Sequence, residues 1–197
     1  ISALGGQIIR IGHGHSGINP LDAGNVEQAA KLLENHPQER SALLAAAHER
    51  KKTMVLSLIQ IIRGSSPSDR EENVIEAALT VLENTCANPV LADLLQVVRD
   101  APEPVLMAAL DRGSLDRYKQ VTEELEASLM ALLNGRLGGI FASATTTPMM
   151  MDRSVVFDVH DMLHEHSDLQ AAVLLASWSY GFATVEISQT LADAGVA

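Results

Sequence analysis

Two groups of histidines have the residue types and spacing that a metal site would need. His13 and His15 are separated by one glycine, and His160 and His164 are four residues apart, which places them on one face of a helix. Imidazole nitrogens are good ligands for zinc and nickel. However, the chain has one cysteine and no His-Glu-x-x-His sequence, so polar loops or a short helix explain these histidines more simply. We predict no metal site and keep the two pairs as the alternative.

Nucleotide hydrolysis would need two motifs, and the chain has neither in full. The first is a glycine-rich loop that ends in Gly-Lys-Ser/Thr, and no Gly-Lys pair occurs. The second is an apolar strand that ends in an acidic magnesium ligand. Val155–Asp158 has this form, but no glutamate follows to activate water, and aspartate is a common turn former. We therefore predict no catalytic residue in this chain by itself.

The remaining candidates form no recognisable active-site motif. Cys86 is the only cysteine, which excludes an intramolecular disulfide, and it is typical of a small core residue. Neither Cys86 nor any serine lies in a Gly-x-Ser-x-Gly turn. Residues 12–17 are rich in glycine, but no helix is expected where a dinucleotide phosphate would bind.

The charge argues against nucleic acid, and the hydropathy pattern argues against a membrane span. Acidic residues outnumber basic ones by 25 to 14, a formal net charge of −11, whereas a nucleic-acid surface needs a basic stripe. The most basic stretch, 50–52, follows Glu49 and fits a solvated helix face. Polar residues and a glycine interrupt the best apolar run, 169–185.

The composition favours packed helices over a sandwich of strands. Apolar residues make up 47% of the chain but aromatic residues only 3%, so the core is built from aliphatic side chains and methionine. Capping-box sequences predict helix starts after Asn25 and Ser68, and Asn88-Pro89 predicts another. We expect helices over about 26–35, 38–63, 69–85, 89–99, 105–110, 115–133 and 168–192, with an irregular stretch over 137–148.

Two short β-branched runs, 7–11 and 154–159, predict strands at opposite ends of the helical block. Strands joined by a helical crossover are usually parallel and in one sheet. A parallel sheet needs cover on both faces, so two such strands indicate a sheet completed by strands outside this chain. The predicted fold class is mainly α with a minor parallel β component: a helical subdomain plus two strands of an incomplete α/β core.

Three sequence blocks resemble conjugation motor ATPases of the VirB4 type, in the HerA–FtsK branch of RecA-like motors. Leu4–Gly12 with Ile18–Asp22 resembles the segment that follows the P-loop helix in that family. Glu123–Phe141 is similar to a later stretch, and Val155–Val159 to the strand shortly before the magnesium-binding strand. The order and spacing agree over nearly the whole chain. The Asn-Pro-Leu-Asp and Asn-Gly-Arg sequences are the more specific parts.

The resemblance implies that the chain is a fragment of a larger RecA-like protein. The phosphate loop would lie upstream of Ile1 and the magnesium carboxylate downstream of Ala197, so ATP and Mg²⁺ would be cofactors of the parent and not of the fragment. The implied segments are a core strand and loop (1–24), a helical subdomain (25–135) and a return to the core (136–197). The residues implied to lie near nucleotide in the parent are Asn19, Asp22 and Arg136.

The implied parent activity is ATP hydrolysis that powers DNA or protein transfer through a type IV secretion channel. Its implied partners are other subunits of a hexameric motor and secretion-channel proteins, in the cytoplasm or at the membrane through those partners. We expect neither direct nucleic-acid binding nor a membrane span in the fragment. Missing sheet neighbours would leave an apolar flank along the first strand, and with it a tendency to dimerise.

Two other functions stay open. A stand-alone helical adaptor would dock a partner protein through exposed apolar surface. A histidine-based metalloprotein is the third reading, and metal analysis would test it. The reading frame around the chain distinguishes the first two, because a fragment predicts an upstream Gly-Lys-Ser/Thr and an adaptor predicts a start codon near Ile1.

Overall fold

The computed structural model describes residues 5–12, 14–109, 114–150, 152–164 and 166–196, without the side chains of 163 and 164. It is mainly helical with two short parallel strands, which confirms the predicted fold class. The elements in chain order are β1 (Gln7–Arg10), α1 (Val26–Leu32), α2 (Pro37–Arg63), α3 (Asp69–Thr85), α4 (Leu91–Asp100), α5 (Glu103–Ala108), α6 (Leu115–Asn134), α7 (Gly138–Phe141), β2 (Val155–Asp158), the 3-10 helix η2 (His160–His164) and α8 (Ser167–Asp193).

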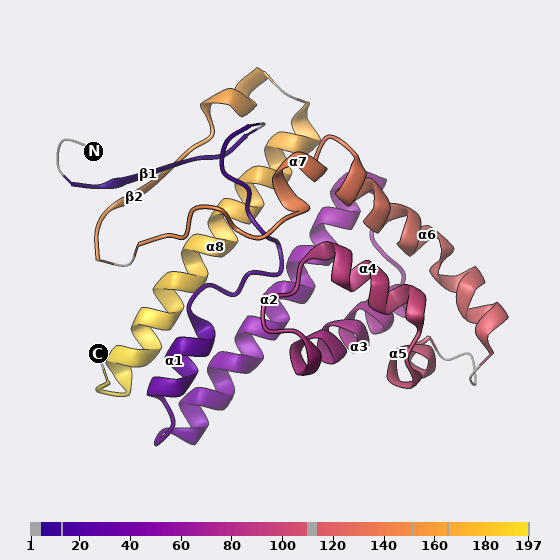
Figure 1. Ribbon diagram of the computed structural model, residues 1–197, viewed down its shortest axis with the longest axis horizontal. Helices are drawn as coiled ribbons and strands as arrows, with labels where there is room; N and C mark the ends of the chain where they lie inside the picture. Colours follow the sequence, from indigo (N-terminus) through magenta and orange to yellow (C-terminus); the bar gives the residue numbers. More distant parts are fainter. Residues whose placement is uncertain (1–4, 13, 110–113, 151, 165, 197) are drawn as a thin grey trace.

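The two strands come from opposite ends of the chain and pair in parallel. Gln7 lies opposite Val155 and Arg10 opposite Asp158, with every residue of each strand in register. Helices α1 to α7 form the connection between them. Figure 1 shows β1 and β2 side by side next to α8, with the remaining helices on the other side of that long helix.

One face of this sheet is covered and the other is open. Ile9 and Phe157 are paired neighbours, so they share a face, and Ile9 is almost fully buried. A Cβ at Gly181 of α8 would lie 4.0 Å from the Phe157 ring, which places α8 on that face. On the opposite face Ile8 is 41% exposed. Parallel sheets are normally covered on both sides, so this sheet lacks part of its usual surroundings.

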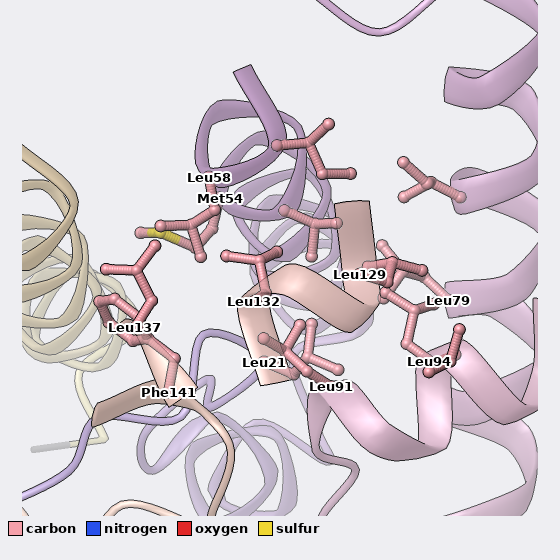
Figure 2. Packing of buried hydrophobic residues seen from close by; sticks show 14 of the residues in the cluster. Leu21, Met54, Leu58, Leu79, Leu91, Leu94, Leu129, Leu132, Leu137 and Phe141 are labelled. Atoms are coloured by element: carbon pink, nitrogen blue, oxygen red, sulfur yellow. The ribbon is translucent and has the colours of Figure 1, made fainter. Parts of the chain in front are cut away.

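The main core joins all parts of the chain. One cluster of buried apolar residues includes Ile9 from β1, Leu58 from α2 and Ala172 from α8. Leu21, from the loop after β1, packs in the same cluster with Leu91 of α4, and Figure 2 shows their side chains close together. A smaller cluster lies among α1, α2 and the second half of α8. Burial of these aliphatic side chains is the main source of stability in the fold.

The helix starts confirm part of the sequence prediction. Ser68 and Glu71 form a capping box at the start of α3. Asn25 is the residue before α1, but its side chain makes no cap hydrogen bond, so the capping box expected there does not form. Helix α4 begins at Leu91, later than Asn88-Pro89 indicated, because the Val90 N–H is capped by the Asp93 carboxylate at 2.9 Å.

Helix α7 lies in the stretch that was expected to be irregular. Its backbone closes through hydrogen bonds from the Ile140 and Phe141 N–H groups to the Leu137 carbonyl oxygen, at 3.0 and 2.9 Å. Ile140 and Phe141 are both fully buried. The turn is therefore stabilised by burial of two side chains against distant parts of the core, which a local pattern of four residues cannot reveal.

Candidate functional site

Charged side chains gather where the two parallel strands end. Arg10 Nε lies 3.4 Å from Asp158 Oδ2, and His15 Nε2 lies 3.1 Å from Asp161 Oδ2. The His160 N–H also donates to Asp158 Oδ1 at 3.1 Å. In open α/β sheets, ligands bind beyond the carboxyl ends of the strands. This end of the sheet is the first candidate site.

The loop after β1 is held in place by three consecutive threonines from the segment before β2. Each threonine hydroxyl bonds to a different residue of the loop. The pairs are Thr147 with the Ser16 hydroxyl (2.7 Å), Thr146 with the Gly17 N–H (3.1 Å) and Thr145 with the Asn19 N–H (3.1 Å). A Cβ at Gly17 would lie 2.9 Å from the Ile140 carbonyl oxygen, so the close approach requires glycine there.

The buried side chain of Asn19 makes hydrogen bonds at both ends of its amide inside the protein. Its Nδ2 donates to the Pro89 carbonyl oxygen at 2.8 Å, and its Oδ1 accepts from the Leu21 N–H at 3.0 Å. Only 6% of Asn19 is exposed. Buried amides are normally satisfied in this way. As arranged, Asn19 ties the loop to the segment before α4, and both ends of its amide have a partner within the protein.

Asn19 and Asp22 line a cleft of about 910 Å³ between the loop, α1, α2 and the end of α3. Asp22 Oδ1 accepts from the Gly24 N–H at 2.7 Å, which closes a tight turn. Lys51 and the half-buried Cys86 also line this cleft. The structure thus brings two of the three residues implied by the resemblance to one cleft.

Arg136 is not among the residues that line the cleft. Its guanidinium lies 3.4 Å from the Asp168 carboxylate at the start of α8, and both side chains are about half exposed, at 54% and 44%. Exposed pairs of this kind contribute about 0–1 kcal/mol. The structure therefore separates Arg136 from Asn19 and Asp22, and it leaves the guanidinium accessible.

One wall of the cleft belongs to a charge network between α2 and α3. His48 Nδ1 lies 2.7 Å from Glu83 Oε2, and His48 Nε2 lies 2.9 Å from Glu76 Oε1. Lys51 donates to Glu83 at 2.9 Å, and Lys52 lies 3.1 Å from Glu76. Only the protonated imidazolium donates from both ring nitrogens, so this geometry fits a charged His48.

The network shifts the pKa values of its members in opposite directions. Burial lowers the pKa of His48, but the hydrogen bonds and charges of Glu83 and Glu76 outweigh it, so the pKa is raised. Burial raises the pKa of Glu83, but the bonds from Lys51 and His48 outweigh it, so that pKa is lowered. The sequence did not reveal this network because its partners lie 28 and 35 residues apart.

A row of exposed apolar side chains runs along α8. Its members repeat at intervals of four, four and three residues, so they share one face of the helix. They are Leu174 (41% exposed), Trp178 (65%), Phe182 (69%) and Val185 (59%), and we call them the α8 strip. Residues 169–185 drew attention only as an interrupted apolar run, although the spacing in the sequence already marks this face.

The acidic side chains at the carboxyl end of the sheet lie in pairs with other side chains. Asp158 lies beside Arg10, and Asp161 lies beside His15. Among residues that the structure describes, no three His, Cys, Asp or Glu side chains form a group that could hold a metal ion. His13 and the side chain of His164 lie outside the described residues, so the two histidine pairs stay an open prediction.

Two further findings concern membrane spans and known proteins. In the described parts of the chain, every helix is too short or too polar to cross a bilayer. Comparison with known protein families, with characterised proteins and with solved structures gives no significant match. The resemblance to conjugation motor ATPases therefore depends on the sequence blocks alone.

Proposed function

We propose that the chain is the part of a conjugative-transfer motor ATPase that lies between the phosphate-binding loop and the magnesium-binding strand. In this role, β1 and β2 belong to a RecA-like core and residues 25–135 form a helical subdomain set on it. The observation that carries the proposal is the in-register parallel pairing of two strands separated by the helical block. Parallel strands joined by a helical crossover are the repeating unit of nucleotide-dependent α/β cores.

The carboxyl end of the sheet supports the same proposal. Arg10 with Asp158 and His15 with Asp161 make this edge polar, where α/β proteins bind their ligands. The fragment contributes the edge, while the phosphate loop and the magnesium ligand belong to flanking parts of the parent. ATP and Mg²⁺ are accordingly ligands of the parent protein, and the isolated chain is inactive.

The three implied residues have different roles in this proposal. Asn19 and Asp22 position the loop after β1, since their side chains are engaged in it. Arg136 has the weak, exposed partner Asp168, so its guanidinium can turn to a phosphate bound by a neighbouring subunit. The partners are then other subunits of a hexameric motor, together with secretion-channel proteins that bring the cytoplasmic motor to the membrane.

Sequencing and calorimetry test this proposal together. The coding sequence should specify Gly-Lys-Ser/Thr upstream of Ile1 and an apolar strand with a terminal acidic residue downstream of Ala197. The isolated chain should show no saturable MgATP binding, whereas a polypeptide extended through both flanks should bind MgATP. A start codon directly before Ile1, or tight magnesium-dependent ATP binding by the isolated chain, would contradict the proposal.

A second candidate function is the helical adaptor, which the α8 strip favours. Four neighbouring apolar side chains that face solvent are a feature of protein-docking surfaces. An adaptor would work without flanking strands and would have its own start codon near Ile1. As an isolated chain, either protein could also dimerise through the exposed Ile8 flank of β1, which an Ile8→Ser variant would weaken in sedimentation measurements.

A further inference from the structure

The exposed face of α8 is uncharged along most of the helix, and we infer that it is the contact surface of a homodimer. In this dimer α8 packs antiparallel to α8 of a second copy of the chain. The inference depends on the α8 strip alone, so it holds whether or not the chain is part of a motor ATPase.

The strip is part of a longer face with the repeat of a helix-packing seam. Four exposed, uncharged residues follow one another at intervals of seven: Ala171, Trp178, Val185 and Ala192. Leu174 and Phe182 lie between them and are also exposed. A seven-residue repeat of apolar residues keeps one face of a helix directed at a partner helix over several turns. The shape of the strip therefore fits a second helix that lies along α8.

The opposite face of α8 is used inside the chain. Ala176, Ala183 and Ile187 are buried there, and the helix packs against α2. Trp178 and Phe182 are 65% and 69% exposed, because the helical repeat directs them away from that buried face. The strip is therefore accessible to another molecule.

The charges next to the strip do not call for a basic partner. Glu186 is paired with Arg50 of α2, and Asp168 lies 3.4 Å from Arg136. The strip itself contains no charged residue, so the surface that matches it is apolar and uncharged as well. The strip of a second copy meets this requirement. Two chains of net charge −11 repel each other, so salt should strengthen the contact by screening that repulsion.

The strip is complementary to itself about a two-fold axis. An axis midway between Trp178 and Phe182 brings Trp178 of each copy next to Phe182 of the other. Leu174 of each copy then lies near Val185 of the other. Each contact occurs twice, as a closed two-fold dimer requires. A parallel pair would instead bring together the negative ends of two helix dipoles and two copies of Asp193, so the antiparallel pair is favoured.

The area of the strip fits a weak dimer. From their exposed fractions, its four side chains expose on the order of 400–500 Å² in each copy. With the neighbouring alanines, two copies would bury on the order of 1,000 Å² in total, which is near the lower limit for a specific interface. We therefore expect monomers at about 1 μM and dimers at about 1 mM.

Fluorescence of Trp178 tests the contact directly, because it is the only tryptophan in the chain. Over this concentration range, sedimentation should show monomers converting to dimers, and the emission maximum should shift to the blue. Phe182→Ser should raise the dissociation constant at least about tenfold. Met107→Ser is the matched control at a 53% exposed site on α5, and it should leave the constant within about twofold. Raising sodium chloride from about 50 mM to about 500 mM should lower the constant.

Disulfide crosslinking tests the direction of the two helices. The background is Cys86→Ser, because Cys86 is the only native cysteine. Leu174→Cys mixed with Val185→Cys should crosslink faster than either variant alone, because only the mixed pair meets across the two-fold axis. Two copies of the same variant would have their cysteines about 15 Å or more apart along the helices, which is beyond the reach of a disulfide.

Four results would overturn the inference. The first is a chain that stays monomeric up to about 1 mM. The second is a dimer that Ile8→Ser removes and Phe182→Ser does not, which would assign the contact to β1. The third is faster crosslinking of identical variants than of the mixture, which would make the helices parallel. The fourth is a dimer that salt dissociates, which would be held together by charges. None of these results bears on the flanking motifs that test the motor proposal.

Discussion

The helical block of α2 to α6 and the sheet end of β1, β2 and α8 differ in how completely their groups are satisfied. In the block, the buried Glu71 carboxylate accepts two bonds from Arg63, at 2.8 and 3.1 Å, and Arg63 also donates to Ser128. The Tyr118 hydroxyl donates to the Val98 carbonyl oxygen at 2.7 Å. At the sheet end, a strand edge is unpaired and Phe182 is 69% exposed.

We infer from this difference that the helical block provides most of the stability of the fold, whereas the sheet end presents the surface available for interactions. Removing a buried side chain from the helical block lowers the stability, because the neighbouring groups lose a hydrogen-bond partner or face a cavity. Removing an exposed side chain from the sheet end costs little stability, because that side chain already contacts water. The following substitutions test this division, starting with the largest expected effect.

Glu71→Ala should destabilise the chain by about 3–5 kcal/mol, because Glu71 is buried and the substitution leaves the Arg63 guanidinium, on a side chain that is only 16% exposed, without its main partner. It also removes the capping box with Ser68. Urea unfolding followed by circular dichroism measures the loss. Glu72→Ala is the control: this exposed residue lies on the same turn of α3 and should cost under about 0.5 kcal/mol. Equal costs for the two variants would show that the pair does not anchor the block.

Leu58→Ala and Phe182→Ala compare the two regions directly. Leu58 is fully buried in the core, so its truncation should cost about 2–5 kcal/mol. Phe182 is mostly exposed, so its truncation should change the unfolding free energy by less than about 0.5 kcal/mol. The same urea titration serves both variants. A loss of more than about 2 kcal/mol of unfolding free energy in Phe182→Ala would contradict the distinction between the helical block and the sheet end.

Asn19→Ala tests the junction between the two regions. It leaves the Pro89 carbonyl oxygen and the Leu21 N–H without their partner, which should cost about 1–3 kcal/mol. Faster hydrogen exchange at the Leu21 amide would localise the effect. Asp22→Asn keeps the oxygen that accepts from Gly24 and should cost under about 0.5 kcal/mol. If Asn19→Ala were as mild as this control, the loop would not depend on that amide.

The His48 network predicts a smaller, pH-dependent effect. The pKa of His48 in the folded chain is raised above 6.5. Its contribution to the free energy of unfolding is therefore complete below pH 6.5 and is lost as the pH rises through the folded pKa. The unfolding free energy of the wild type relative to His48→Gln should therefore fall as the pH rises above 6.5. A difference that grows with pH would contradict the assignment of a charged His48.

The lowered pKa values of Glu71, Glu76 and Glu83 act in the opposite direction. The contributions of these glutamates to the free energy of unfolding are present above pH 4.5 and are lost as the pH falls through their pKa values in the folded chain. The chain should therefore be most stable between the acidic range, in which these glutamates become protonated, and the higher range, in which His48 loses its proton. Acid should weaken the contacts of α2 with α3 first, since all three carboxylates belong to α3 and have their partners on α2.

Sequence patterns predicted an element correctly where interactions between residues close in the sequence determine it. Ser68 and Glu71 are three residues apart and form the expected cap, and the β-branched runs at 7–11 and 154–159 form the paired strands. Helix α7 and the start of α4 were missed or misplaced, because burial of Ile140 and a side-chain cap from Asp93 decide them.

The candidate sites were harder to predict because their parts meet only in the folded chain. Asn19 was expected near nucleotide, but Pro89 and Thr145, 70 and 126 residues away, determine its surroundings. Arg136 meets Asp168 instead of the cleft. The α8 strip was not predicted either, although the spacing of Trp178 and Phe182 in the sequence puts them on one face of a helix.

The pairing of Gln7 with Val155 has a consequence for how the polypeptide reaches its native state. Closing a loop of this length has an entropic cost that grows only slowly with length, but the contact cannot form until both ends are brought together. The helices in between are closed by local backbone hydrogen bonds and can form early. We therefore expect the two strands to join last, on a scaffold that is already compact, and to separate first when the protein unfolds.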